Sequence, residues 1–301
     1  MLKIDINGVL FKNPILVASG TYGYGNESAG LVDIDKIGAI ITKSVTRLPR
    51  EGNPPPRIVE TNGGMLNSIG LANLGVEKYC SDKVPYLNSI NTNFIINIAG
   101  TTIDDYIEIL DILESSNSNH VGYEINISCP NVKEGGMQFG VSKTMTSELT
   151  SELRKRTKKI IIMKLSPNVT DIADIGKSAE DSGADAVSAI NTVVGLAIDI
   201  KKRSTILSTN FGGLSGPAIK PIALAAVYKL YKKLSIPIIG MGGISNSNDA
   251  IEFIMAGSSM VQIGTRNYSF PDASMEISNG IEVFLKENKI PNIADLIGAA
   301  H

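Results

Sequence analysis

The feature that most constrains the fold is a repeated alternation of short apolar segments with helical patterns. Each apolar segment is rich in Ile, Val and Ala and is bounded by turn residues. Most are apolar on both faces, as parallel strands must be when they are buried between a core and a layer of helices. The predicted strands are residues 15–19, 39–45, 94–99, 123–128, 160–166, 186–191, 237–242 and 260–265.

Helical patterns fill most of the intervals, for example residues 103–113, 172–182, 218–234, 248–256 and 275–287. Gly183 and Gly257 each follow such a pattern and lead into the next strand, as C-capping glycines do. Eight strand–helix units in 301 residues, with no low-complexity linker, predict one α/β domain over residues 1–301, a (β/α)₈ or TIM barrel. An open doubly wound sheet is the alternative, but no G-x-G-x-x-G motif follows the first strand.

Two intervals between strands are much longer than the others, residues 45–94 and 191–237. Both begin just after a strand, so on a barrel they would be insertions rising from the C-terminal face, where active sites lie. They are rich in glycine and proline but carry apolar residues, which favours ordered covers over disordered loops.

Composition narrows the function classes. The chain has 28 basic and 30 acidic side chains, so the basic surface expected for a nucleic acid partner is absent. No apolar run approaches the roughly 20 residues of a membrane span, and the first residues lack a signal peptide. The only cysteines, Cys80 and Cys129, cannot form a disulfide framework, and no pattern of metal ligands occurs. We therefore expect a cytoplasmic protein without a membrane partner, a nucleic acid partner or a metal site.

Glycines at the ends of the last two predicted strands suggest a phosphate site. One strand ends Gly240-Met241-Gly242-Gly243, and the other ends Ile263-Gly264-Thr265. In barrels these two loops and a helix N-terminus frequently bind phosphate through backbone N–H groups. Glycines that only make tight turns are the alternative interpretation.

Polar residues gather at the C-terminal ends of five other strands. They are Lys43 and Ser44, Asn97, Asn126, Lys164, and Asn191 with Thr192. Lys43 and Lys164 sit on otherwise apolar strands, where an unpaired ammonium is costly to bury. An anionic partner, such as a phosphate, a carboxylate or a flavin, would remove that cost.

Few residues can serve as a general base. His120 precedes a predicted strand, at the N-terminal end of the barrel, and His301 is the last residue. Cys129 follows the end of the fourth predicted strand, and nearby lysines would favour its thiolate. Cys80, on a predicted helix after the first long interval, is expected to be an inert, buried thiol.

Several of these segments together resemble one family. Asn126-Ile127-Ser128-Cys129-Pro130-Asn131-Val132-Lys133 is similar to the catalytic motif of cytosolic dihydroorotate dehydrogenases, which are FMN-binding barrels. Residues 64–71 resemble the substrate loop of that family, and residues 212–221 resemble its flavin loop. The resemblance runs from the first strand to about Thr265 and implies oxidation of dihydroorotate to orotate in pyrimidine biosynthesis.

The resemblance also implies a branch of the family. The segments 131–136 and 52–57 are similar to the NAD-linked branch, whose FMN-binding catalytic subunit pairs with an electron-transfer subunit. That partner carries FAD and a [2Fe–2S] cluster, which this chain cannot ligate with two cysteines. A heterotetramer of two catalytic and two transfer subunits is the implied assembly. A fumarate-linked homodimer is the alternative within the family.

Residue by residue, the resemblance implies two binding sets. FMN would be held by Ser19, Lys43, Ser44, Asn97, Asn126, Lys164, Ile190, Gly216, Gly242, Gly243, Gly264 and Thr265. Dihydroorotate would contact Lys43, Asn67, Ser68, Ile69, Gly70, Leu71, Asn126, Asn131, Asn191 and Thr192. Amide side chains suit this substrate because each offers both a donor and an acceptor.

The implied mechanism assigns Cys129 as the base that removes a proton from C5 while a hydride passes from C6 to FMN. Lys164 would stabilise negative charge on the flavin. Two remoter alternatives are a tRNA dihydrouridine synthase, which would need an RNA-binding surface, and an FMN scaffold subunit without turnover.

Overall fold

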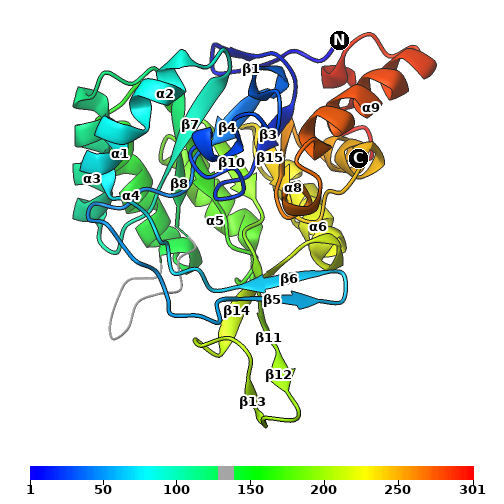
Figure 1. Ribbon diagram of the computed structural model, residues 1–301. Helices are drawn as coiled ribbons and strands as arrows, with labels where there is room; N and C mark the ends of the chain where they lie inside the picture. Colours follow the sequence, from blue (N-terminus) through cyan, green and yellow to red (C-terminus); the bar gives the residue numbers. More distant parts are fainter. Residues whose placement is uncertain (128–138) are drawn as a thin grey trace.

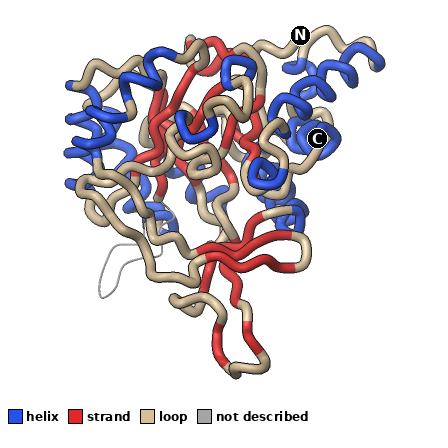
Figure 2. Tube along the Cα trace, in the orientation of Figure 1, coloured by secondary structure: helices blue, strands red, loops and turns tan. Residues whose placement is uncertain are grey.

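A closed barrel of eight parallel strands forms the centre of the computed structural model, which describes residues 1–127 and 139–301 (Figures 1 and 2). Every barrel strand overlaps a predicted strand, so the predicted (β/α)₈ barrel is confirmed and the open sheet is wrong. In chain order the strands are β3 (Ile15–Val17), β4 (Ala39–Ile41), β7 (Asn93–Ile98), β8 (Gly122–Asn126), β9 (Ile160–Lys164), β10 (Ala186–Ala189), β15 (Ile238–Met241) and β16 (Met260–Ile263).

Apolar residues on both faces explain why these segments become barrel strands. All residues of β3, β4 and β9 are buried, because one face fills the barrel and the other packs beneath the helices. The ring closes where β16 pairs with β3, placing Gln262 opposite Leu16. The C-terminal ends of all eight strands therefore open at the same end of the barrel, which we call the mouth.

Amphipathic helices surround the barrel. In α3 the buried residues Tyr106, Ile109, Leu110 and Leu113 recur every three or four positions, which gives one apolar face. The surrounding helices are α1 (Val76–Asp82), α2 (Val84–Ser89), α3 (Ile103–Ser115), α4 (Lys143–Arg154), α5 (Ile172–Asp181), α6 (Lys220–Tyr231), α7 (Ser247–Met255), α8 (Arg266–Ser269) and α9 (Ala273–Glu287). Short 3₁₀ turns are η1 (Asn26–Ser28), η2 (Ile34–Lys36), η3 (Phe139–Val141), η4 (Pro217–Ile219) and η5 (Ile293–Leu296).

One predicted helix needs correction. The pattern over residues 218–234 is divided into η4 and α6, and α6 ends at Tyr231. Pro221 has no N–H, and its ring would meet the carbonyl four residues before it in a continuous helix, so α6 starts afresh at Lys220. The two predicted capping glycines are confirmed, since Gly183 and Gly257 have φ angles of 99° and 117°.

A short hairpin lies at the end of the barrel opposite the mouth. Its strands β1 (Ile4–Ile6) and β2 (Val9–Phe11) pair antiparallel. Ile4, Ile6 and Phe11 are buried against the barrel core, and Figure 1 shows the hairpin far from the insertions. In the described part of the chain, no helix is long and apolar enough to cross a membrane.

The two long insertions meet in one antiparallel sheet beside the mouth, which we call the mouth sheet (Figure 1). Its order is β11-β14-β6-β5, so β6 of the first insertion pairs directly with β14 of the second. The predicted ordered covers are therefore confirmed. The strands are β5 (Ile58–Thr61), β6 (Gly64–Asn67), β11 (Val193–Leu196) and β14 (Phe211–Ser215), and a small hairpin of β12 (Ile198–Asp199) and β13 (Ser204–Thr205) extends beyond them.

Close approach of backbones within the mouth sheet predicts a cost for one substitution. A Cβ added at Gly64 would lie 2.0 Å from the backbone oxygen of Ser215, so Gly64→Ala must push β6 and β14 apart. We expect the free energy of unfolding in urea to fall by about 1–3 kcal/mol. Gly195→Ala in β11 is the matched control, because its Cβ would come closest to the end of the flexible Leu66 side chain, at 2.9 Å, and would make an ordinary contact with Leu214. Equal stability of the two variants would contradict this expectation.

Candidate active site

The polar residues predicted at the strand ends lie at the mouth, and three of them are joined by hydrogen bonds. The Ser44 hydroxyl donates to Oδ1 of Asn97 at 2.5 Å. Asn97 Nδ2 and Lys164 Nζ both donate to Oε1 of Glu124, at 2.7 and 3.3 Å. These side chains come from neighbouring strands or the loop after β4, so the barrel itself brings them together.

Glu124 is the centre of this cluster. Its side chain is fully buried, and its second carboxylate oxygen accepts from Ser188 Oγ at 2.9 Å and from Gln262 Nε2 at 2.6 Å. A carboxylate accepts about four hydrogen bonds, and these four donors supply them all. We call Glu124, Asn97, Lys164, Ser188 and Gln262 the Glu124 cluster.

The Glu124 cluster changes one expectation drawn from the sequence. The ammonium of Lys164 does not need an anionic ligand to offset its burial, because it is paired with Glu124. Glu124, Ser188 and Gln262 were not among the site residues expected from the sequence, although a signal was present. Each lies two positions before an expected site residue, so in a strand its side chain points to the same face. The expected residues in question are Asn126, Ile190 and Gly264.

A pair of amides lies next to this cluster. Asn191 Nδ2 donates to Oδ1 of Asn126 at 3.2 Å, and the backbone N–H of Thr192 donates to Oδ1 of Asn191 at 2.8 Å. Tyr106 supports the pair from outside the barrel, since its hydroxyl donates to the backbone oxygen of Asn126 at 2.8 Å. The structure thus places three residues of the expected substrate set together.

The expected substrate loop, residues 64–71, comprises β6 and the four residues after it. Asn67, the last residue of β6, donates to Gly213 O of β14 at 3.4 Å. Asn53 holds the next part of the loop, with its amide Nδ2 on Ser68 O and its backbone N–H on Ile69 O. The Ser68 hydroxyl is buried and has no partner among the described residues, as expected for a group that awaits a ligand.

The other residues of this loop are Gly70 and Leu71, both with positive φ. In the described part of the chain, no hydrogen bond links residues 68–71 to the Glu124 cluster. Residues 68–71 and the Glu124 cluster therefore lie at the same mouth without a direct hydrogen bond between them.

Lys43 brings positive charge to the same end of the barrel. Burial lowers the pKa of Lys43 below 10.5, and the neighbouring charge of Arg57 lowers it further, while Glu27 acts in the opposite direction. Arg57 donates to the backbone oxygens of Glu51 and Asn53 at 3.4 Å. A carboxylate or another anion bound beside Lys43 and Arg57 would offset the repulsion between these two cations and the cost of burying Lys43.

The glycines expected to bind phosphate also lie together. A Cβ on Gly243 would lie 2.8 Å from Gly216 O, and the Thr265 hydroxyl donates to Ser215 Oγ at 2.7 Å. Among the described residues, the backbone N–H groups of Gly242, Gly243, Gly264 and Thr265 have no acceptor. Next to Gly264 the space is open, since a Cβ there would touch only Ala18, at 3.6 Å. Free N–H groups at adjacent strand ends suit a phosphate.

The remaining expected residues take defined places. Ile190 is buried at the end of β10, and its N–H donates to Met241 O. Ser19, just after β3, donates its hydroxyl to Thr42 O at 2.8 Å. Cys129 and Asn131 lie outside the described residues.

Both histidines and Cys80 lie away from the mouth. Burial lowers the pKa of His120 to about 4, and this ring precedes β8 at the opposite end. His301 stacks on Tyr228. Cys80 lies on α1, where partial burial raises the pKa of its thiol. Within residues 1–127 and 139–301, no cluster of His, Cys, Asp and Glu could hold a metal ion.

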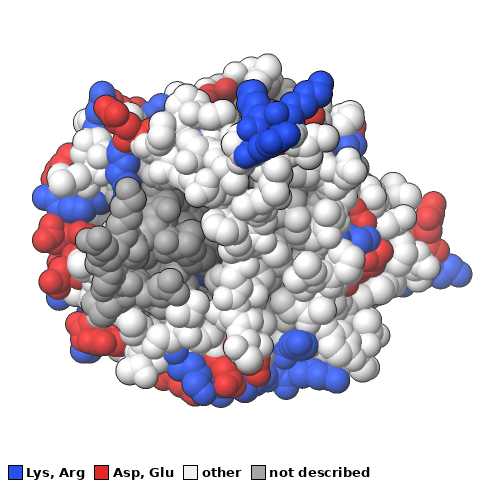
Figure 3. Space-filling model, turned by 90° about the horizontal axis from the view of Figure 1, so that it is seen from below, with Lys and Arg blue, Asp and Glu red and all other residues white. Residues whose placement is uncertain are grey.

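The face that carries the mouth sheet is largely uncharged. Seen from this side, Lys, Arg, Asp and Glu lie mainly around its edge, apart from one group of basic side chains that stands on the face itself (Figure 3). Several apolar side chains of the second insertion are exposed, namely Val194, Leu196, Ile198, Ile200 and Phe211. Exposed apolar residues gathered on one insertion are typical of a surface that another chain covers.

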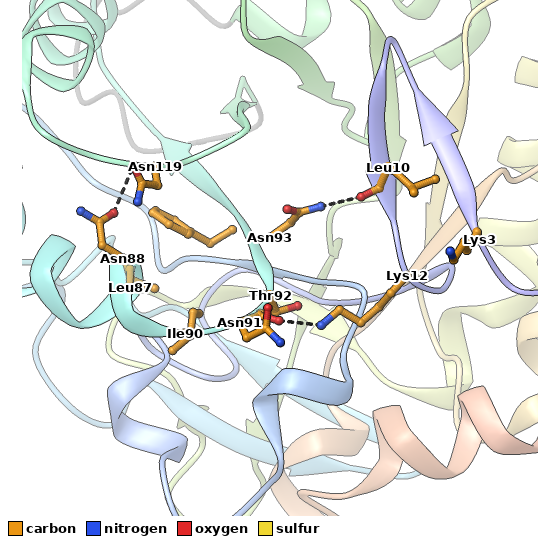
Figure 4. Close-up of a pocket in the computed structure, with 11 residues that line it drawn as sticks. Lys3, Leu10, Lys12, Leu87, Asn88, Ile90, Asn91, Thr92, Asn93 and Asn119 are labelled. Carbon is orange, nitrogen blue, oxygen red and sulfur yellow. Dashed lines mark hydrogen bonds between the residues drawn. The ribbon is translucent and has the colours of Figure 1, made fainter.

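A pocket of about 460 Å³ lies at the opposite end of the barrel, between the β1–β2 hairpin and the segment before β7 (Figure 4). Its polar groups bond to one another: Lys12 Nζ donates to Asn91 O at 2.6 Å, and Asn93 Nδ2 donates to Leu10 O at 3.0 Å. None of the expected site residues lines it. The candidate active site is therefore the mouth and not this pocket.

Known proteins similar to this chain identify its family. The family model described as dihydroorotate dehydrogenase matches residues 1–285. A protein of Desulforamulus reducens is 49% identical over 300 residues, which cover 100% of this chain and 98% of the relative. A protein of Pelobacter propionicus is 48% identical over 298 residues, which cover 99% and 98%. Both relatives are named dihydroorotate dehydrogenase B (NAD(+)), catalytic subunit. The chain belongs to the dihydroorotate dehydrogenase family.

Proposed function

We propose that this chain, as a single FMN-binding barrel domain, oxidises dihydroorotate to orotate in pyrimidine biosynthesis. The observation that carries the proposal is the set of backbone N–H groups without acceptors at Gly242, Gly243, Gly264 and Thr265. They lie at the same mouth as the amides and lysines expected for the ring and the substrate. The names of the relatives support the same reaction.

The residues of the mouth divide between cofactor and substrate. The four N–H groups and Gly216 would hold the phosphate of FMN, while Ser19, Ser44, Asn97, Lys164 and Ile190 would hold its ring. Bound there, FMN supplies the two-electron acceptor for the hydride that leaves C6 of dihydroorotate. Asn126, Asn191 and Thr192 would bind the amide edges of the substrate, together with the loop of Asn67, Ser68, Ile69, Gly70 and Leu71.

Positive charge orients the substrate and assists its oxidation. Dihydroorotate carries a carboxylate, and Lys43, with Arg57 nearby, offers the cation that would bind it. Lys164 would stabilise the negative charge that the flavin gains when it accepts the hydride. Cys129 follows β8 by three residues and would accept the proton from C5 as its thiolate.

The electrons must then leave the chain. The name "catalytic subunit" of the relatives implies a second kind of subunit in their enzymes, and NAD(+) is the acceptor that the name gives. We infer that an electron-transfer subunit carrying FAD and a [2Fe–2S] cluster binds this chain, in a heterotetramer of two copies of each in the cytoplasm. The exposed apolar residues of the second insertion support such an assembly.

Replacing Cys129 tests the proposed base. A positioned base contributes about 10²–10⁴ in rate, so Cys129→Ala should slow the anaerobic bleaching of the flavin by dihydroorotate at least 100-fold. FMN binding, measured by fluorescence, should persist. Cys80→Ala is the control and should bleach at the normal rate. Bleaching of Cys129→Ala at a near-normal rate would remove Cys129 from this role.

The pH dependence of orotate binding tests Lys43. The charged form of Lys43 binds the carboxylate, and its pKa in the free protein lies below 10.5. As the pH rises through this lowered pKa, the ammonium is lost and the dissociation constant of orotate should increase, up to tenfold per pH unit. Lys43→Gln should bind orotate weakly, without this increase. The same pH profile in both proteins would exclude Lys43 as the carboxylate ligand.

Acceptor assays test the electron route. The purified chain alone should not reduce NAD⁺ at a useful rate, because it has no G-x-G-x-x-G fingerprint for a dinucleotide. It should not reduce fumarate either, because the proposed route passes the electrons to a second subunit. NAD⁺ reduction by dihydroorotate should appear on addition of an electron-transfer subunit. Rapid fumarate reduction by the chain alone would instead support the fumarate-linked homodimer.

A further inference from the structure

We propose that Glu124 is a positioning residue that holds Lys164 in place and offsets its positive charge, and thereby sets the reduction potential of the bound flavin. This inference rests on the proposed function, because it assumes that FMN binds at the mouth. It assigns a role to a buried side chain that no step of the proposed reaction uses.

The hydrogen bonds of Glu124 tie four other strands to one point. Oε1 accepts from Asn97 of β7 and Lys164 of β9, and Oε2 accepts from Ser188 of β10 and Gln262 of β16. Both oxygens are therefore saturated, and the carboxylate has no freedom to turn. Asn97 in turn accepts from Ser44, so Glu124 holds three residues of the expected FMN set in register.

The positions of Glu124 and Lys164 along their strands show which of the two charges lies nearer the mouth. Along the β8–β9 ladder Asn126 pairs with Lys164, and Glu124 pairs with Ile162, so Lys164 lies one pleat nearer the mouth. The Glu124 side chain is fully buried, whereas that of Lys164 is 9% exposed. Lys164 is thus the outward member of the pair, and Glu124 is its counter-charge from below.

Glu124 and Lys164 are the two charged residues of the Glu124 cluster, and their charges are opposite. Of the four donors to Glu124 only Lys164 is a cation, so the buried pair is neutral as a whole. Removing the carboxylate takes this counter-charge away from the ammonium in a poorly solvated place. The added net positive charge favours the reduced, more negative flavin over the oxidised one, because charge near the ring tunes its electronics.

The test measures the two-electron potential of bound FMN by equilibration with a redox dye. Glu124→Gln keeps the shape of the side chain and removes its charge. We expect this variant to prefer reduced over oxidised FMN at least tenfold more strongly than the native chain does. This change raises the potential of the bound flavin by about 30 mV for a two-electron couple. The FMN dissociation constants of both redox forms, measured on the apoprotein, give the same ratio independently.

Ser188→Ala is the matched control, because it removes a neutral donor from the same carboxylate and leaves both charges in place. Its ratio should stay within threefold of the native value. Glu124→Asp withdraws the carboxylate from Lys164 but keeps the charge, so it should fall between the two. This variant also keeps the test available if Glu124→Gln does not fold.

The outcomes separate this inference from the proposed function. A native chain that binds no FMN would end the proposed function itself. A native chain that binds FMN, with Glu124→Gln and Glu124→Asp at the native potential or below it, would overturn only the role of Glu124. A rise in Ser188→Ala as large as that in Glu124→Gln would show that packing and not charge sets the potential.

Discussion

The closure of the strand ring is the constraint on which the rest of this structure depends. Once β16 pairs with β3, every strand must end at the same opening, whatever the sequence between strands does. Side chains as distant in sequence as Lys43 and Thr265 then share one end of the barrel. The helices that cover the outside leave the mouth as the place where long insertions can be accommodated.

The sequence predicts the barrel well, because its strands are identified by a local property. A segment such as residues 160–164, apolar at four of five positions, can only be buried on both faces, and the structure buries all of it. The helices are also local, since their apolar residues recur at helical spacing. The error over residues 218–234 is local too: the apolar pattern continued through Pro221, but the backbone could not follow it.

The site is only partly predictable, since it depends on partners that are distant in sequence. Lys164 looked unpaired because Glu124 lies 40 residues earlier on another strand. Likewise, nothing near Gly64 indicates that β6 will pair with β14, about 150 residues later. The expected roles of Cys129 and Asn131 rest on the sequence and its resemblance, because neither residue lies in the described part of the chain.

The pairing of β6 with β14 has a consequence for the order in which the protein matures. The segment expected to bind the substrate continues directly from β6. One edge of β6 pairs with β14, so this edge has no partner until residue 215 has left the ribosome. Six of the eight barrel strands are synthesised before that moment, and two follow it. A nascent chain can therefore assemble much of its framework while the segment expected to hold substrate still lacks half its support. The segment expected to bind the substrate therefore gains its full support only after residue 215 has been made.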